Sequence, residues 1–123
     1  MNLVDSSGWL EYLAGGRNSK FFVPAVENLP KLIVPTICIY EVFKRIVQQR
    51  NEDDALQAVA LMHQGRVVDL DAALALDSAR MSDELKLPMA DSIILATARH
   101  YQATLWTQDA DFKGMDNVKF FDT

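Results

Sequence analysis

Two aspartates directly follow short apolar runs that we expect to be β-strands. Asp5 comes after residues 1–4, and Asp109 lies two residues beyond the run 104–107. If these strands are parallel, their carboxyl ends meet at one edge of a sheet, which is where open α/β sheets bind their ligands. An aspartate in such a position also commonly caps the helix or turn that follows it. Each aspartate taken alone can therefore be either a ligand-binding residue or a cap of the following helix or turn.

Two further acidic residues lie on predicted helices. Asp91 has apolar residues three, four and seven positions further on, so its carboxylate lies along the apolar stripe of its helix. Burying a charge is costly unless it is paired, hydrogen-bonded or bound to a cation, and the amides of the first helical turn are one possible partner. Glu41 lies off the apolar face of its helix, where a surface ion pair with Arg45 would also account for it.

Four carboxylates brought together would form a site for a hard divalent cation. Mg²⁺ and Mn²⁺ prefer oxygen ligands, whereas clustered carboxylates without a cation repel one another and their pKa values rise. One or two such cations can orient water for in-line attack on a phosphodiester and stabilise the leaving oxygen. We therefore expect four residues to bind Mg²⁺ or Mn²⁺ and to be catalytic, namely Asp5, Glu41, Asp91 and Asp109.

The predicted elements that must position these acids alternate between short apolar runs and longer helical patterns. Strands are expected at residues 1–4, 32–34, 66–70, 104–107 and 118–121. Helices are expected at residues 7–13, 20–27, 36–49, 51–63, 72–85 and 90–101. This alternation predicts an α/β fold in which helices cover both faces of a mostly parallel sheet of about four to five strands. A length of 123 residues fits a single domain over residues 1–123.

Composition limits the classes of protein and of partner. The chain is 50% hydrophobic and 24% charged, which is typical of a globular protein. Its net charge of −5 argues against a broad basic surface for RNA, although bound metal would reverse the sign of the charge near the acids. The single cysteine, Cys38, fits a reducing compartment, and the first residues lack the features of a signal peptide. We therefore expect a cytoplasmic protein without membrane spans.

Four segments carry the acids in order along nearly the whole chain. They are Leu3-Val4-Asp5-Ser6-Ser7, Tyr40-Glu41-Val42, the ten residues 89–98 (Met-Ala-Asp-Ser-Ile-Ile-Leu-Ala-Thr-Ala) and Thr107-Gln108-Asp109-Ala110-Asp111-Phe112. Together they resemble the PIN-domain family and, within it, the VapC-like toxins of type II toxin–antitoxin pairs. The resemblance implies a three-layer α/β/α sandwich and a metal-dependent endoribonuclease that hydrolyses RNA phosphodiester bonds.

The resemblance also implies roles for further residues. Asp111 would be an auxiliary metal ligand, and Ser7 and Thr107 would hold either metal-bound water or a carboxylate. Basic residues that could contact RNA are few, and each is by default a solvated surface residue. The candidates are Arg17, Arg45 and Arg99.

The activity of family members is usually inhibited by a partner protein. The resemblance implies a cognate antitoxin that lays a helix or an extended segment over the groove of the site. Family antitoxins often place an arginine among the carboxylates, where it can pair bidentately and compete with the metal. Toxins of this family usually form dimers, so exposed apolar positions would belong to an interface.

Two other functions account for part of the pattern. An aspartate at the end of a first parallel strand can also accept a phosphoryl group, but haloacid-dehalogenase-type phosphatases usually need a second aspartate where this chain has Ser7. Receiver domains usually need an acidic pair beside the first strand and a lysine at a late strand end, and neither is present. A catalytically silent PIN-like module that only binds a partner would be favoured by loss of an acid, yet all are retained.

Overall fold

The computed structural model describes residues 1–122. Within them the strands are β1 (Asn2–Val4), β2 (Leu32–Pro35), β3 (Arg66–Val68), β4 (Thr104–Thr107) and β5 (Val118–Phe120). The α-helices are α1 (Ser6–Leu13), α2 (Ser19–Val26), α3 (Thr36–Gln49), α4 (Glu52–Met62), α5 (Ala72–Leu85) and α6 (Met89–His100). Two short 3-10 helices, η1 (Leu29–Lys31) and η2 (Ala110–Phe112), complete the order.

The sequence-based elements are confirmed, with small differences at their ends. The largest is in β3, which ends at Val68 and not at residue 70. The reason lies in Asp71, whose side chain accepts a hydrogen bond of 2.8 Å from the amide of Leu74 and thereby caps α5. The chain must leave the sheet before this cap, because an N-cap residue already belongs to the start of its helix.

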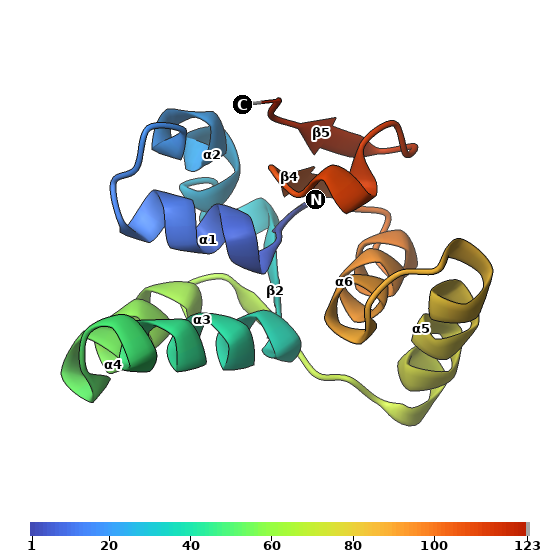
Figure 1. Cartoon of the computed structure of the whole chain (residues 1–123), viewed down its shortest axis with the longest axis horizontal. Helices are drawn as coiled ribbons and strands as arrows, with labels where there is room; N and C mark the ends of the chain where they lie inside the picture. The colour runs from blue at the N-terminus through green and yellow to red at the C-terminus, as the bar shows by residue number, and fades with distance from the viewer. Residues whose placement is uncertain (123) are drawn as a thin grey trace.

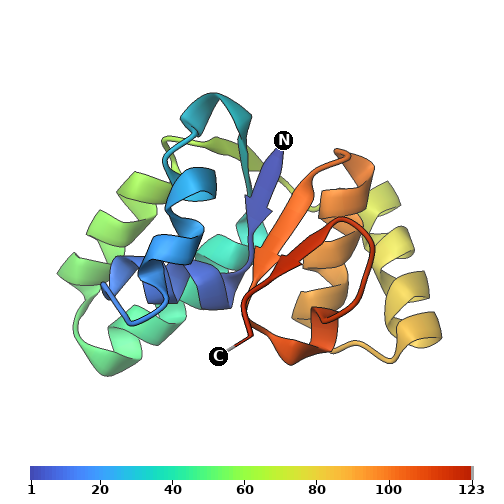
Figure 2. The same cartoon turned by 90° about the horizontal axis from the view of Figure 1, so that it is seen from above.

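The strands form one five-stranded sheet in the order β3-β2-β1-β4-β5, and every neighbouring pair is parallel. Helices α1 to α4 lie on one side of the strands and α5 and α6 on the other, which gives the three-layer α/β/α sandwich that was expected (Figures 1 and 2). Because all strands run in the same direction, their carboxyl ends lie along a single edge of the sheet.

The two central strands bring the first site residues together. Leu3 and Val4 of β1 are fully buried, as is typical of a parallel strand covered on both faces. The register pairs Val4 with Trp106 of β4. The next residues along each strand, Asp5 and Thr107, therefore leave the sheet side by side.

Helix α1 packs unusually close to the sheet at its start, and a glycine makes this possible. A Cβ atom added at Gly8 would lie 2.6 Å from Cε1 of Phe22 and 2.7 Å from Cγ1 of Val4, both fully buried. Any larger residue would have to displace core side chains that pack at near-crystalline density. The first turn of α1 is thus fixed against the core directly after Asp5.

Helix α6 is the most deeply buried helix of residues 1–122, with seven consecutive buried residues from Ser92 to Ala98. It packs against α5 on one side and against β4 and α3 on others. Its first turn carries Asp91 to the same edge of the sheet as Asp5. None of the helices in residues 1–122 has both the length and the apolar character needed to cross a membrane.

Candidate metal centre

The four predicted acids meet at one cavity at the carboxyl edge of the sheet. Asp5 follows β1, Glu41 lies on the second turn of α3, Asp91 on the first turn of α6, and Asp109 follows β4. These elements come together near the centre of Figure 1. The cavity, called here the acid cavity, has a volume of about 230 Å³ and is lined by Asp5, Ser6, Ser7, Leu10, Glu41, Arg45, Asp91, Ile94 and Asp109.

Asp5 is the most firmly held of the acids and is only 2% exposed. The amide of Gly8 donates to its Oδ1 at 2.8 Å, and Thr107 Oγ1 donates to its Oδ2 at 2.5 Å. Ser7 Oγ lies 2.9 and 3.0 Å from the two oxygens and can donate its single hydrogen to either. Because a carboxylate offers about four lone-pair sites, three donors leave roughly one for a cation.

Three other carboxylates approach one another closely enough to share a cation. One oxygen from each of Asp91, Asp109 and Asp111 lies within 4.8 Å of the other two. The amide of Asp111 donates to Asp109 Oδ1 at 2.9 Å, and Thr107 Oγ1 accepts from the amide of Asp109 at 2.9 Å. Thr107 therefore connects Asp5 to Asp109, and η2 places Asp111 beside them.

Glu41 of α3 lines the acid cavity. Ser6 Oγ donates to its Oε1 at 2.6 Å, across 35 residues of sequence. A surface pair between Glu41 and Arg45 is not formed, since the ion pairs within residues 1–122 do not include either residue. The contact with Ser6 instead ties α3 to the first turn of α1.

The interpretation of Asp5 and Asp109 as caps is confirmed. Asp5 is the N-cap of α1, and Asp109 is the N-cap of η2. Capping uses Oδ1 in both residues and leaves Oδ2 for other contacts. Capping and metal binding are thus compatible, because each role engages different lone pairs of the same carboxylate.

Burial and mutual repulsion raise the pKa values of two acids. Loss of solvent at Asp5 raises its pKa to about 6, against the hydrogen bonds from Thr107, Gly8 and Ser7 that lower it. Loss of solvent, followed by repulsion from Asp109, raises the pKa of Asp91 to about 7. In residues 1–122 no lysine, arginine or histidine forms an ion pair with any of the five carboxylates. A cation bound among them would reduce the repulsion between the carboxylates and stabilise their charged forms.

The two predicted hydroxyl residues both hold a carboxylate. Ser7 and Thr107 donate to Asp5, which is the second of the two roles that the resemblance allowed. Ser6 was missed, although it is buried and lines the acid cavity. Its position next to Asp5 was the available signal, but its partner Glu41 could not be identified without the packing of α1 on α3.

The three arginines lie in different places. Arg45 is the one cation among the residues that line the acid cavity. Arg17 lies in the turn between α1 and α2, and Arg99 lies in the last turn of α6, at the other end of the helix from Asp91. In residues 1–122 the structure brings Arg45 to the acids, and it does not bring Arg17 or Arg99 to the lining of that cavity.

Comparison with known proteins agrees with the fold. The PIN domain family model matches residues 3–118, whereas no curated protein sequence matches the chain. A toxin–antitoxin complex from Klebsiella pneumoniae is 23% identical, with a TM-score of 0.81 over 97% of this chain and 96% of that one. The VapC20 toxin of Mycobacterium tuberculosis, which cleaves the sarcin–ricin loop, is 20% identical, with a TM-score of 0.79 over 97% and 99%. VapBC2 from Rickettsia felis, bound to promoter DNA, is 14% identical, with a TM-score of 0.76 over 98% of both chains.

The raised pKa values predict how stability depends on pH when no metal is present. A carboxyl group with a raised folded-state pKa stabilises the fold below its unfolded pKa of 3.8 and loses that contribution as pH rises through the folded value of about 7. Asp91→Asn should therefore lose less unfolding free energy than the wild type between pH 5 and pH 8, by about 1–2 kcal/mol once solvent screening of this half-buried side chain is allowed for.

Urea denaturation in EDTA at the two pH values measures this difference. Asp77→Asn is a suitable control, because Asp77 lies on the exposed face of α5 and pairs only with Arg80. An unfolding free energy with the same pH dependence in the wild type and in Asp91→Asn would contradict the raised pKa of Asp91.

Proposed function

The chain belongs to the PIN domain family, and from this premise we propose that it is a metal-dependent endoribonuclease, the toxin of a VapBC-type toxin–antitoxin pair. The observation that carries the proposal is the convergence of Asp5, Glu41, Asp91 and Asp109, from four separate elements, on one cavity. Such a cluster is unfavourable for the fold itself, because it raises pKa values without an ion pair to compensate. The proposed nuclease domain comprises residues 1–123.

In this proposal Asp91, Asp109 and the auxiliary Asp111 hold Mg²⁺ or Mn²⁺ together with the remaining lone pair of Asp5. The donor set fits a hard cation, because all its members are carboxylate oxygens and none is engaged by a basic side chain within residues 1–122. When bound, such a cation activates water for attack on a phosphodiester and offsets the charge on the leaving oxygen.

The residues around the ligands have supporting roles in the same proposal. Thr107 and Ser7 fix the orientation of Asp5 through their hydroxyl groups. Ser6 holds one oxygen of Glu41, so the other oxygen is available to orient the attacking water. Fixed ligands matter because a near-attack geometry removes much of the entropic cost of the reaction.

For the RNA itself, Arg45 is the best-placed contact. It is exposed, lines the acid cavity and forms no ion pair within residues 1–122. An unpaired guanidinium beside the cavity can bind a phosphate oxygen of the substrate bidentately and would partly offset the acidic surroundings. Arg17 and Arg99 would contact only more distant parts of a bound RNA.

The nuclease is tested by incubating purified protein with total cellular RNA, with Mg²⁺ or Mn²⁺ and with EDTA. We expect discrete fragments that disappear with EDTA, and a loss of roughly 100-fold or more in rate for Asp91→Asn, because a metal contributes several kcal/mol of transition-state stabilisation. The matched control Asp77→Asn makes the same chemical change on the exposed face of α5 and should cleave like the wild type.

Two results would contradict the proposal in different ways. Cleavage that persists in EDTA and in Asp91→Asn would show that the acids are not the catalytic site. A folded wild-type protein that neither binds Mn²⁺ nor cleaves RNA would instead favour the catalytically silent, partner-binding PIN-like module.

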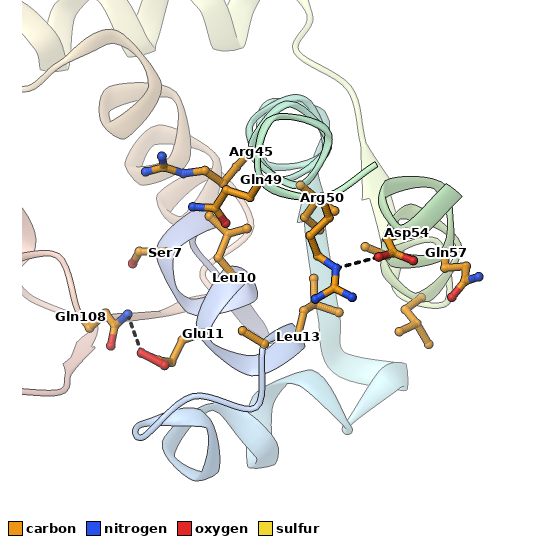
Figure 3. Close-up of a pocket in the computed structure, with 14 residues that line it drawn as sticks. Ser7, Leu10, Glu11, Leu13, Arg45, Gln49, Arg50, Asp54, Gln57 and Gln108 are labelled. Atoms are coloured by element: carbon orange, nitrogen blue, oxygen red, sulfur yellow. Dashed lines mark hydrogen bonds and ion pairs between the residues drawn. The ribbon is translucent and has the colours of Figure 1, made fainter. Parts of the chain in front are cut away.

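A second, larger cavity suggests where the proposed antitoxin binds. It has a volume of about 920 Å³, lies between α1, α3 and α4, and is called here the helix groove (Figure 3). It shares Ser7, Leu10 and Arg45 with the acid cavity, so the two lie next to each other. Its apolar lining comes from Leu10, Leu13, Ala14, Ile46, Ala58 and Leu61. An antitoxin segment with apolar side chains could therefore fill the groove and direct a basic residue to the acids.

This interface predicts unequal effects of two leucine substitutions. Leu61 lies in the helix groove and is 47% exposed, whereas Leu76 is 59% exposed on α5 and does not line the groove. Leu61→Lys should weaken binding of the antitoxin encoded beside the toxin by roughly tenfold or more, and Leu76→Lys should not, because only the first buries a charge in the complex. Isothermal titration calorimetry measures both affinities. Equal affinities for the two variants would exclude the helix groove as the binding surface.

We also propose that the chain forms a homodimer. Large apolar side chains are exposed on α3, at the end of α5 and at the start of α6, namely Tyr40, Leu85 and Met89. Their exposure on a monomer would be unfavourable, and self-association would cover them. Sedimentation velocity that finds only the 13.8 kDa monomer at high concentration would exclude the dimer.

A further inference from the structure

We propose that Gln108 is a positioning residue for Asp109, and that Asn18 and Glu11 hold it in place through a chain of side-chain hydrogen bonds. This chain of Asn18, Gln108 and Glu11 is called here the amide bridge. The inference rests on the proposed function, because Asp109 is positioned for the binding of a divalent cation.

Gln108 lies between the two residues that organise the site. On one side Thr107 donates to Asp5, and on the other Asp109 contributes a carboxylate to the candidate metal centre. The side chain of Gln108 points toward Glu11 of α1, where it lines the helix groove (Figure 3). Its Oε1 accepts from Asn18 Nδ2 at 3.0 Å, and its Nε2 donates to Glu11 Oε2 at 3.3 Å.

Asn18 makes this contact instead of the one that its local position favours. It is the N-cap of α2, a position where asparagine commonly accepts a hydrogen bond from an amide of the first turn. Here its side chain makes no such bond, is 8% exposed, and donates to Gln108 across 90 residues of sequence. The side chain of Asn18 is therefore oriented by its tertiary contact with Gln108 and not by capping of α2.

The carboxylate of Glu11 lies against the turn that follows α1. A Cβ atom added at Gly16 would lie 1.5 Å from Glu11 Oε1, so the absence of a side chain at Gly16 leaves room for the carboxylate. Gly15 has a φ of +60°, a conformation that glycine adopts without strain. The turn between α1 and α2 is therefore shaped so that both ends of the amide bridge meet Gln108.

The bridge acts on the acids through the short segment from Thr107 to Asp109. The hydroxyl group of Thr107 contacts both Asp5 and the amide of Asp109, so a rotation of the peptide at Gln108 would move Asp109 and disturb the amide that bonds to this hydroxyl. Gln108 anchors that peptide to α1 and to the start of α2. Residues that orient metal ligands in this indirect way typically change metal affinity by 10–100-fold when they are lost.

The test measures binding of Mn²⁺ alone, from the electron paramagnetic resonance signal of the free ion. We expect Gln108→Met and Asn18→Ala to raise the dissociation constant for Mn²⁺ by roughly 10–100-fold. Gln108→Met keeps the length of the side chain and removes the amide. Tyr12→Phe is the matched control, because it removes a hydrogen bond from α1 to the end of α2, Tyr12 to Glu27 at 2.9 Å, and leaves Gln108 untouched. Its affinity should equal that of the wild type.

A second readout separates positioning from general destabilisation. With excess Mn²⁺, the maximal RNA cleavage rate of Gln108→Met should return to within about twofold of the wild type, while the metal concentration for half-maximal rate rises with the dissociation constant. A folded Gln108→Met protein with wild-type Mn²⁺ affinity would overturn the inference and leave the proposed function intact. Wild-type protein that binds Mn²⁺ without cleaving RNA would overturn the proposed nuclease alone, and absence of Mn²⁺ binding by the wild type would overturn both.

Discussion

The carboxylate of Asp5 lies at the carboxyl end of the central strand, buried from solvent and held by an amide and two hydroxyl groups. Two of these donors, Ser7 and Gly8, belong to α1 and the third, Thr107, ends β4, so the same hydrogen bonds that keep a charge in the interior also connect the elements around it. Gly8 permits this arrangement because it lets α1 approach the core. Two of the other acids are placed relative to this anchor, Asp109 through Thr107 and Glu41 through the first turn of α1.

The clustered carboxylates of the site are unfavourable for the folded protein when no cation is bound. Loss of solvent raises the pKa of Asp5 to about 6, and loss of solvent together with repulsion from Asp109 raises that of Asp91 to about 7. Four surface acids within residues 1–122 instead pair with nearby arginines or lysines, as Asp54 does with Arg50. A group of acids without such partners at the ligand-binding edge of a parallel sheet is the expected signature of a functional site, because function is a reason to retain unfavourable charges.

Much of this arrangement could be predicted from the sequence, and the exceptions have a common cause. Parallel strands deliver the residues that follow them to one edge, so the places of Asp5 and Asp109 followed from local apolar runs alone. Glu41 resembled a surface residue because helix periodicity describes one helix and not its neighbours. Its contact with Ser6, and those of Gln108 with Asn18 and Glu11, join residues that are 35, 90 and 97 positions apart. Contacts of that kind depend on tertiary packing and leave no local pattern.

The most direct test of the metal centre is the anomalous scattering of Mn²⁺ in crystals of the wild-type protein. We predict a peak inside the acid cavity, about 2 Å from carboxylate oxygens of Asp91 and Asp109, since hard cations bind oxygen at that distance. Asp5 and Asp111 should lie in the same coordination sphere or one water molecule away. A peak only at exposed acids such as Asp53, or no peak in the acid cavity at saturating Mn²⁺, would contradict the assignment of these carboxylates to a metal site.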